Sequence, residues 1–150
     1  MERSTTMKGK GFYFDFQAFL EYHQKNNTPC TPSVSHIFAL NVQLDRILKE
    51  GLDNRFARHQ EMANYCRNWA VERFALFPEE GYESITLTTV TNTREIDVAA
   101  LNKALAAKDA TIGNGYGKLK DKTIRIAHMG DCTLDQIKEL LVNIDEFLGV

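Results

Sequence analysis

The chain has 150 residues, with 18 Lys and Arg residues against 20 Asp and Glu residues, so its formal net charge is -2. This length predicts one domain, large enough to bury a core without metal ions or disulfides. The near-neutral charge argues against a dedicated nucleic-acid-binding protein. No apolar run is long enough for a transmembrane helix, and residues 1–6 lack the apolar stretch of a secretory signal. We therefore expect no nucleic-acid partner and no membrane.

The cysteines indicate a reducing compartment. Cys30, Cys66 and Cys132 are an odd number of widely separated residues, without a CxxC pair. Zinc sites need Cys and His at short spacings, and no two of the four histidines have the i, i+4 spacing of a helical metal pair. We expect partly buried free thiols, no metal site and a cytoplasmic protein.

The first 30 residues combine a polar start at 1–11 with an aromatic run, a helical stretch and a turn-rich stretch. The aromatic run at residues 12–16 is compatible with a short strand or an extended arm. Residues 17–24 predict a short helix with three apolar members. Turn-forming residues follow at 26–32, where two prolines favour extended backbone in the residues before them.

Two helices are predicted in the middle of the chain. Thr31 occupies the position of a helix N-cap and Pro32 that of a first helical residue. Apolar residues then recur at helical spacing to Lys49. A second helix is predicted over residues 53–73. Gly51, between them, predicts either the end of the first helix or a kink in one long helix.

The second half predicts, in order, a strand at 85–90, a helix after Asp97, an extended piece at 111–112, a glycine-rich turn at 113–117, a strand at 123–129 and a helix after Thr133. Gln136 follows Thr133 at the spacing of a capping box. The order β–α–β–β–α from residue 82 predicts an α/β (α+β) sandwich, with helices on one face of a mostly antiparallel sheet.

The glycine cluster at 113–117 does not match a phosphate-binding loop. It fits neither GxGxxG nor GxxxxGK[ST], and the segment that follows it is a predicted strand instead of a helix. A glycine-rich turn between two strands is the better interpretation.

Arg125 is a candidate binding residue because isoleucines flank it in a predicted strand. An arginine in such a place must find an anion or reach water, since an unpaired buried charge is costly. Residue type alone favours an internal ion pair with Asp or Glu. The alternative is a fork that binds a substrate carboxylate through two parallel hydrogen bonds.

Residues 27–31 form a second candidate site. They offer an amide and two hydroxyl groups close to a helix N-terminus, a combination that can hold a phosphate. The same residues are also typical of an ordinary turn that caps a helix.

Three segments together resemble the class V aminotransferases, which are fold-type I enzymes that use pyridoxal 5'-phosphate. The resemblance is to the serine–glyoxylate, alanine–glyoxylate and phosphoserine aminotransferase group. It lies in residues 27–32 leading to 37–40, in residues 50–59, and in residues 124–130 after the glycine cluster. The resemblance spans nearly the whole chain, and it is the order and co-occurrence of these segments that is specific.

The resemblance implies roles for four residues. Arg125 matches the family arginine that binds the substrate α-carboxylate. Thr28 and Thr31 fall in the segment that reaches across the dimer to the cofactor phosphate of the other subunit, and Asn27 is a further candidate there.

The resemblance also implies a domain division. Residues 1–45 would be a remnant of the large PLP-binding domain with the start of a long linking helix. Residues 46–150 would be the C-terminal small α/β domain.

The function implied is that of the C-terminal portion of a homodimeric PLP-dependent aminotransferase. The enzyme would transfer an amino group from serine, alanine or phosphoserine to a 2-oxo acid such as glyoxylate. In relatives the lysine that holds the cofactor lies upstream of the matched part, so we expect no catalytic residue, no covalently bound cofactor and no activity in this chain alone.

Two alternatives are a desulfurase or lyase of the same class and a non-catalytic dimerisation module. The first needs a cysteine loop that Cys30 and Cys132 do not resemble.

Overall fold

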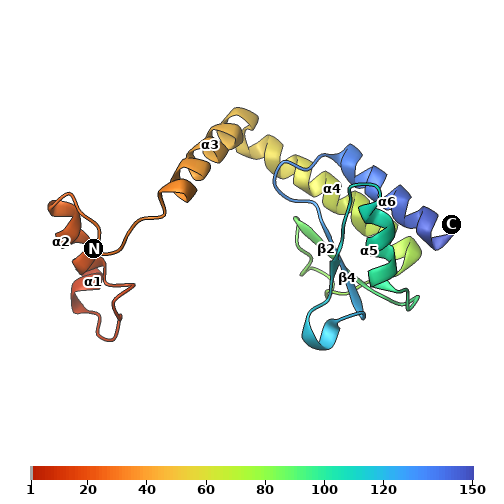
Figure 1. Ribbon diagram of the computed structural model, residues 1–150, viewed down its shortest axis with the longest axis horizontal. Helices are drawn as coiled ribbons and strands as arrows, with labels where there is room; N and C mark the ends of the chain where they lie inside the picture. Colours follow the sequence, from red (N-terminus) through yellow and green to blue (C-terminus); the bar gives the residue numbers. More distant parts are fainter. Residues whose placement is uncertain (1) are drawn as a thin grey trace. The chain divides into compact units, whose positions relative to one another are not determined.

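A computed structural model describes residues 2–150 of the chain (Figure 1). The chain divides into two compact units, one ending at Arg46 and the other running from Ile47 to Val150. The elements, in order, are α1 (Glu2–Thr6), α2 (Phe16–Gln24), α3 (Val34–Glu50), α4 (Leu52–Arg73), β1 (Ala75–Leu76), β2 (Leu87–Thr91), α5 (Val98–Ala106), β3 (Gly113–Asn114), the 3-10 helix η1 (Gly117–Leu119), β4 (Thr123–Ala127) and α6 (Leu134–Leu148).

The first unit is built around a capped short helix. The Asp15 carboxylate accepts hydrogen bonds from the backbone N–H groups of Gln17 (3.1 Å) and Ala18 (3.4 Å), which fixes the start of α2. It also pairs with Lys10 Nζ at 2.8 Å. The preceding aromatic run forms a turn, in which the Asp15 N–H donates to Phe12 O at 3.4 Å, so the strand interpretation of residues 12–16 is wrong.

Helix α3 begins two residues later than the sequence predicts. Ser33 provides the first acceptor, because its carbonyl oxygen accepts from the Ile37 N–H at 3.1 Å. The Ser33 hydroxyl is also 2.6 Å from His36 Nδ1. Ser33 is therefore the N-cap in place of Thr31, and Pro32 lies outside the helix.

Gly51 separates α3 from α4. Its φ of 83° is a left-handed backbone conformation that residues with a Cβ rarely adopt. The Gly51 N–H closes α3 on Ile47 O at 2.9 Å, while its carbonyl accepts from the Arg55 N–H at 3.0 Å to begin α4. The chain thus has two helices joined at one residue, and not one continuous kinked helix.

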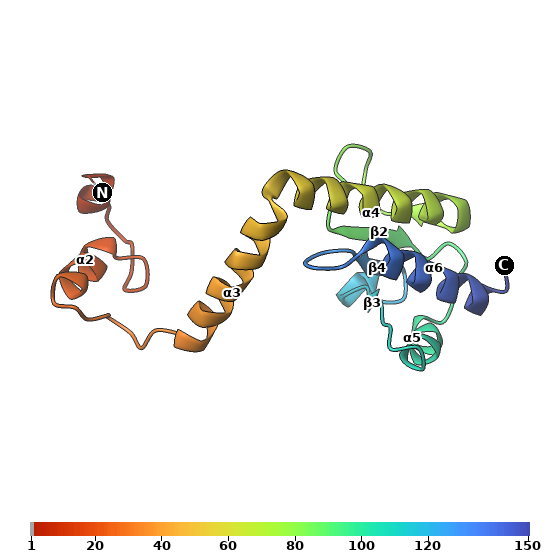
Figure 2. The same cartoon turned by 90° about the horizontal axis from the view of Figure 1, so that it is seen from above.

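The second unit contains a four-stranded antiparallel sheet in the order β1–β2–β4–β3. Figure 2 labels its strands β2, β4 and β3. The central pair β2–β4 sets the register, with Thr89 opposite Arg125 and Val90 opposite Ile124. On the other side of β4, Gly113 of β3 is also opposite Arg125. The edge strand β1 was not predicted, because two residues are too few to show an alternating pattern.

Helices α4, α5 and α6 bury one face of the sheet (Figures 1 and 2). Alternate residues of the central strands, such as Val90 and Ile126, point into this core, so the side chains between them belong to the other face. The side chains of the core cluster are Met62, Cys66, Trp69, Ala70, Phe74, Val90, Val98, Leu101, Leu105, Ile112, Ile124, Ile126, Ile137, Leu141 and Ile144. The predicted sandwich, with helices on one face of an antiparallel sheet, is confirmed.

The last two helices begin where the sequence predicts. Asp97 caps α5 by accepting from the backbone N–H groups of Ala99 and Ala100. Thr133 and Gln136 form the predicted capping box at the start of α6. Within residues 2–150, no helix is both long and apolar enough to cross a membrane.

Candidate functional site

Arg125 lies in the middle of β4, on the sheet face that the helices leave uncovered. Its neighbours across the two ladders are Thr89 on β2 and Gly113 on β3. The side chain is half-buried, while Ile124 and Ile126 on either side of it are buried in the core. The alternation of the strand therefore keeps the guanidinium out of the core and presents it on the open face.

Two contacts hold the Arg125 side chain. Its Nε–H donates to the backbone oxygen of Asn114 at 2.9 Å. Its Cζ atom lies 4.2 Å from the centroid of the Tyr116 ring, a cation–π distance. Among the described residues, no carboxylate forms an ion pair with Arg125 and neither terminal amino group donates to the protein. The internal ion pair favoured by residue type is therefore not formed there.

Two glycines make room for this arrangement. A Cβ atom on Gly113 would lie 3.1 Å from Arg125 Nη2 and 3.2 Å from Nε, tighter than ordinary side-chain contacts. A Cβ atom on Gly115 would overlap the backbone carbonyl of Leu119. The start of the glycine cluster thus packs against Arg125. Residues 113 and 114 form strand β3, and only the rest of the cluster belongs to the connection between β3 and β4, so the turn interpretation is confirmed in part.

Two asparagines fix the backbone that carries these contacts. Asn102 on α5 accepts from the Ile112 N–H at 2.9 Å and donates to Ile112 O at 3.0 Å, just before β3. Asn114 donates to the Asp121 carboxylate at 2.6 Å and accepts from the Asp121 N–H at 2.8 Å. The segment beside Arg125 is therefore tied down at both of its ends.

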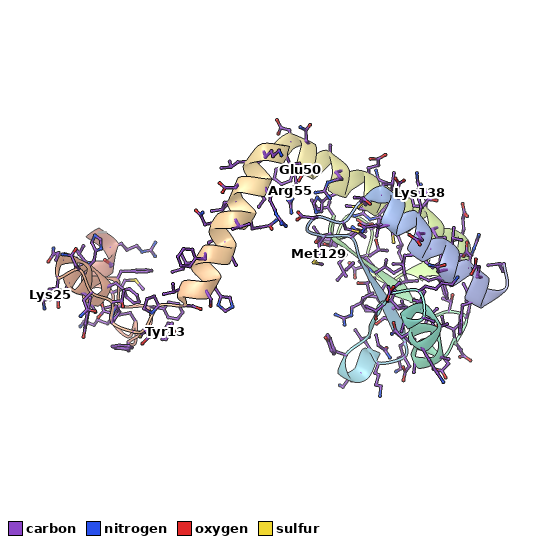
Figure 3. All side chains as sticks on the ribbon, turned by 45° about the horizontal axis from the view of Figure 1, so that its top comes forward. Tyr13, Lys25, Glu50, Arg55, Met129 and Lys138 are labelled. Carbon is purple, nitrogen blue, oxygen red and sulfur yellow. The ribbon has the colours of Figure 1, made fainter. Side chains whose placement is uncertain are left out.

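An ion cluster anchors the loop that follows β4. Glu50 accepts from Arg58 Nε at 2.7 Å and from Arg55 Nη1 at 2.8 Å. Glu50 and Arg55 are labelled in Figure 3, where α3 meets α4. Arg58 also donates to Gly130 O at 3.1 Å and to Cys132 O. The hydrogen bond from Arg58 is the main reason that the pKa of Glu50 falls from its ordinary 4.5 to about 2. The cluster joins the start of α4 to the loop after the Arg125 strand.

A buried polar group lies behind β4. His128 is fully buried, and its Nε2 is 2.9 Å from the Thr88 hydroxyl. Burial lowers the pKa of His128 below its ordinary value. His59 is also buried and contacts Arg55 O through Nδ1 at 2.7 Å. These groups are core contacts on the far side of the sheet from the Arg125 fork.

The other predicted site residues lie in the first unit. Asn27, Thr28 and Thr31 are all exposed, in the irregular segment between α2 and α3. The Asn27 side-chain oxygen accepts from the Thr28 N–H at 2.8 Å, which leaves its NH2 group as the donor. The segment keeps one amide and two hydroxyl groups exposed, but Arg125 belongs to the other compact unit.

The described residues contain neither a metal-binding cluster nor a disulfide. Within residues 2–150, no group of three His, Cys, Asp or Glu side chains is arranged to hold a metal ion. All three cysteines are free, with Cys30 exposed, Cys132 half-buried and Cys66 buried. The exposure of Cys30 differs from the expectation that every thiol is partly buried, because no core covers the segment that carries it.

Arg125 is a candidate from the sequence, whereas the residues that hold its side chain are not predicted there. Tyr116 and Asn114 were part of a segment interpreted only as a turn. Their role depends on the β3–β4 register, which brings residues about ten apart into contact. A Gly-Asn-Gly-Tyr segment preceding a strand that contains an arginine is the signal that could have indicated the contact.

Comparisons with known proteins identify close relatives of this fold and sequence. No family model matches the chain. It is 34% identical over 138 residues to an uncharacterized aminotransferase of Methanocaldococcus jannaschii, covering 90% of this chain and 36% of the relative. It is 29% identical over 153 residues to a serine–glyoxylate aminotransferase of Arabidopsis thaliana, covering 99% and 38%.

Solved structures give the same result. A phosphoserine aminotransferase from Cytophaga hutchinsonii matches with a TM-score of 0.77 and 29% identity, over 93% of this chain and 39% of that one. An alanine–glyoxylate aminotransferase from Nostoc sp. matches with a TM-score of 0.78 and 26% identity, over 95% and 39%. The chain therefore spans between a third and two fifths of the length of these proteins. By sequence and fold it belongs to the class V, fold-type I aminotransferases and corresponds to their C-terminal portion.

Proposed function

We propose that this chain works as the C-terminal portion of a PLP-dependent aminotransferase that moves an amino group from a small amino acid to a 2-oxo acid. The donor we propose is serine, alanine or phosphoserine, and the acceptor is a 2-oxo acid such as glyoxylate. The names of the relatives, which include serine–glyoxylate, alanine–glyoxylate and phosphoserine aminotransferases, support this choice.

The observation that carries the proposal is the state of Arg125. Its Nε is held by Asn114 O, its terminal amino groups have no protein acceptor among the described residues, and it lies on the open sheet face. A guanidinium so placed binds a carboxylate through two parallel hydrogen bonds. Amino-acid donors and 2-oxo acid acceptors share a carboxylate, so one fork serves both halves of the reaction.

The cofactor is assigned to the first unit by donor chemistry. Thr28 and Thr31 offer exposed hydroxyl groups and Asn27 an exposed NH2 group, which suit phosphate oxygens. We propose that these three residues hold the phosphate of pyridoxal 5'-phosphate on the partner subunit of a homodimer. When bound, the cofactor supplies the electron sink for amino-group transfer. No lysine of this chain matches the family motif that holds the cofactor, so that lysine would belong to another segment.

The surface of the first unit supports its assignment to a larger domain. Among the described residues of α2 and α3, none is buried. Large apolar side chains there, such as Phe14 and Phe38, are 71% and 69% exposed. We therefore propose that residues 1–45 belong to the large PLP-binding domain, and that residues 46–150 form the small domain. The unpaired cysteines favour a cytoplasmic location.

The proposal is tested with a longer protein in which this chain is joined to the upstream segment that the proposal implies. That protein is expected to develop an absorbance band near the visible edge when pyridoxal 5'-phosphate is added, and to convert serine and glyoxylate into hydroxypyruvate and glycine. The 150-residue chain alone is the matched control, and it should do neither. A longer protein with no band and no transamination would favour a non-catalytic dimerisation module.

The cofactor assignment has its own test. Thr28→Val and Thr31→Val remove one hydroxyl group each and keep the β-branched shape. In the longer protein each variant is expected to weaken binding of pyridoxal 5'-phosphate about ten- to a hundredfold, as expected for one hydrogen bond to a charged group. Ser35→Ala, in the first turn of α3, removes a neighbouring hydroxyl as a control. Unchanged affinity in both threonine variants would contradict the assignment.

A further inference from the structure

Tyr116 makes one clear contact although its side chain is 78% exposed. Its ring faces the Arg125 guanidinium, with 4.2 Å between Cζ and the ring centroid. Within the described part of the chain, its hydroxyl group forms no hydrogen bond. The ring face, and not the phenol oxygen, is therefore the part of Tyr116 that interacts with the protein.

The backbone holds Tyr116 in this position. On one side, the Gly115 N–H donates to Thr123 O at 3.0 Å, which attaches the segment to β4. On the other side, Tyr116 O accepts from the Leu119 N–H at 2.9 Å, at the start of η1. These two bonds fix the backbone on both sides of the Tyr116 side chain. The backbone, and not a packed core, therefore holds the ring beside Arg125.

Three features then limit the freedom of the Arg125 side chain. Asn114 O fixes Nε, the backbone of Gly113 lies against Nε and Nη2, and the Tyr116 ring covers a face of the guanidinium. An arginine fork binds a carboxylate in the plane of the guanidinium, through its terminal amino groups. A side chain that is already held in one orientation loses less conformational entropy when the carboxylate binds.

We propose that Tyr116 is a positioning residue that orients the Arg125 fork for the substrate carboxylate. The proposal rests on the carboxylate-binding role of Arg125 proposed above. Tyr116 acts through Arg125, by stacking on the guanidinium with its ring face. The phenol hydroxyl has no part in the effect, so phenylalanine should replace tyrosine and alanine should not.

The test uses the isotope-labelled 150-residue chain and nuclear magnetic resonance. Arg125→Lys identifies the Nε–Hε signal of Arg125 by its disappearance. In Tyr116→Ala we expect this N–H vector to become more mobile on the picosecond–nanosecond timescale, while in Tyr116→Phe it stays as in the wild type. Titration with acetate, the simplest carboxylate probe, should give a dissociation constant about two- to fivefold higher in Tyr116→Ala only.

The outcomes distinguish the positioning role of Tyr116 from the carboxylate-binding role of Arg125. Wild-type mobility and acetate affinity in Tyr116→Ala would overturn the positioning role, as would equal losses in the Ala and Phe variants. An Arg125 signal that acetate does not move in the wild type would instead overturn the carboxylate role of Arg125, while the mobility comparison still decides whether Tyr116 orients it. Thermal melting of each variant checks the fold, which an exposed side chain should leave unchanged.

Discussion

Gly113 and Arg125 are direct partners in the β3–β4 ladder, and the absence of a side chain on Gly113 is what lets the guanidinium lie against β3. A methyl group at this position would lie 3.1 Å from Nη2 and 3.2 Å from Nε. The glycine thus contributes to the geometry of the fork although it has no functional group of its own.

Gly113→Ala is expected to weaken carboxylate binding without unfolding the chain. The added methyl group must move the Arg125 side chain by a few tenths of an ångström, and an off-rotamer arginine should lose about two- to tenfold in acetate affinity. Titration of the chain with acetate, followed by nuclear magnetic resonance, measures this affinity. Gly115→Ala is the contrasting variant, since its methyl group would overlap the Leu119 carbonyl and should lower the melting temperature instead. Wild-type acetate affinity in Gly113→Ala would contradict the packing argument.

Asn102→Ala is expected to lower the free energy of unfolding by about 1–3 kcal/mol, because the N–H and C=O of buried Ile112 lose their partner. Asn102→Asp keeps the acceptor for the Ile112 N–H but replaces the donor to Ile112 O by a carboxylate oxygen, so it should also lower the free energy of unfolding. Urea denaturation measures both. Equal stability of all three chains would show that Asn102 does not anchor β3.

The ion pair between Glu50 and Arg58 predicts a loss of stability in acid. The pKa of Glu50 in the folded chain, about 2, lies below its ordinary 4.5, because Arg58 donates a hydrogen bond to the carboxylate. The folded state therefore gains stability from this group above pH 4.5 and loses it as the pH falls toward 2.

Glu50→Gln removes that ionisation and tests the prediction. The difference in melting temperature between wild type and variant should be largest above about pH 5 and shrink between pH 5 and 2. Asp53→Asn, one turn further along, is the control for a carboxylate that no ion pair holds among the described residues. A difference that stays constant with pH would contradict the assignment.

The three cysteines are expected to differ in their reaction with iodoacetamide. Burial raises the pKa of the Cys66 thiol to about 11, and it also raises the pKa of Cys132. Cys30 is exposed. Since the thiolate is the reactive form, Cys30 should be labelled first and Cys66 last at pH 8. Mass spectrometry of timed samples measures the order, and labelling in urea should abolish it. Equal rates for Cys30 and Cys66 in the folded chain would exclude this burial pattern.

Much of the second unit could be predicted from the sequence, because its signals are local. Asp97 and Thr133 cap their helices through atoms two or three residues away, and the apolar stripe of α6 repeats over four turns. The ends of the helices were less predictable. Thr31 has the residue type of an N-cap, and only the hydrogen bond to Ser33 O shows that α3 begins after Ser33 instead.

The environment of Arg125 could not be predicted, because it depends on the packing of two strands. Residue type favoured an acidic partner, but the β3–β4 register instead brings a backbone oxygen and the Tyr116 ring to the guanidinium. The resemblance to aminotransferases indicated the carboxylate role, while the geometry shows why the fork stays unpaired within the described chain. The role of Asn27, Thr28 and Thr31 stays a prediction.

The most direct test of the carboxylate-binding role of Arg125 is the KM of the proposed longer aminotransferase for serine and glyoxylate after Arg125→Ala. One fork that binds the carboxylate of both the donor and the acceptor predicts that KM for serine and KM for glyoxylate both rise at least about tenfold, as expected for lost hydrogen bonds to a charged group. Arg94→Ala, in the loop after β2, is the control for the loss of a positive charge. Unchanged KM values for both substrates in Arg125→Ala would contradict the carboxylate-binding role of Arg125.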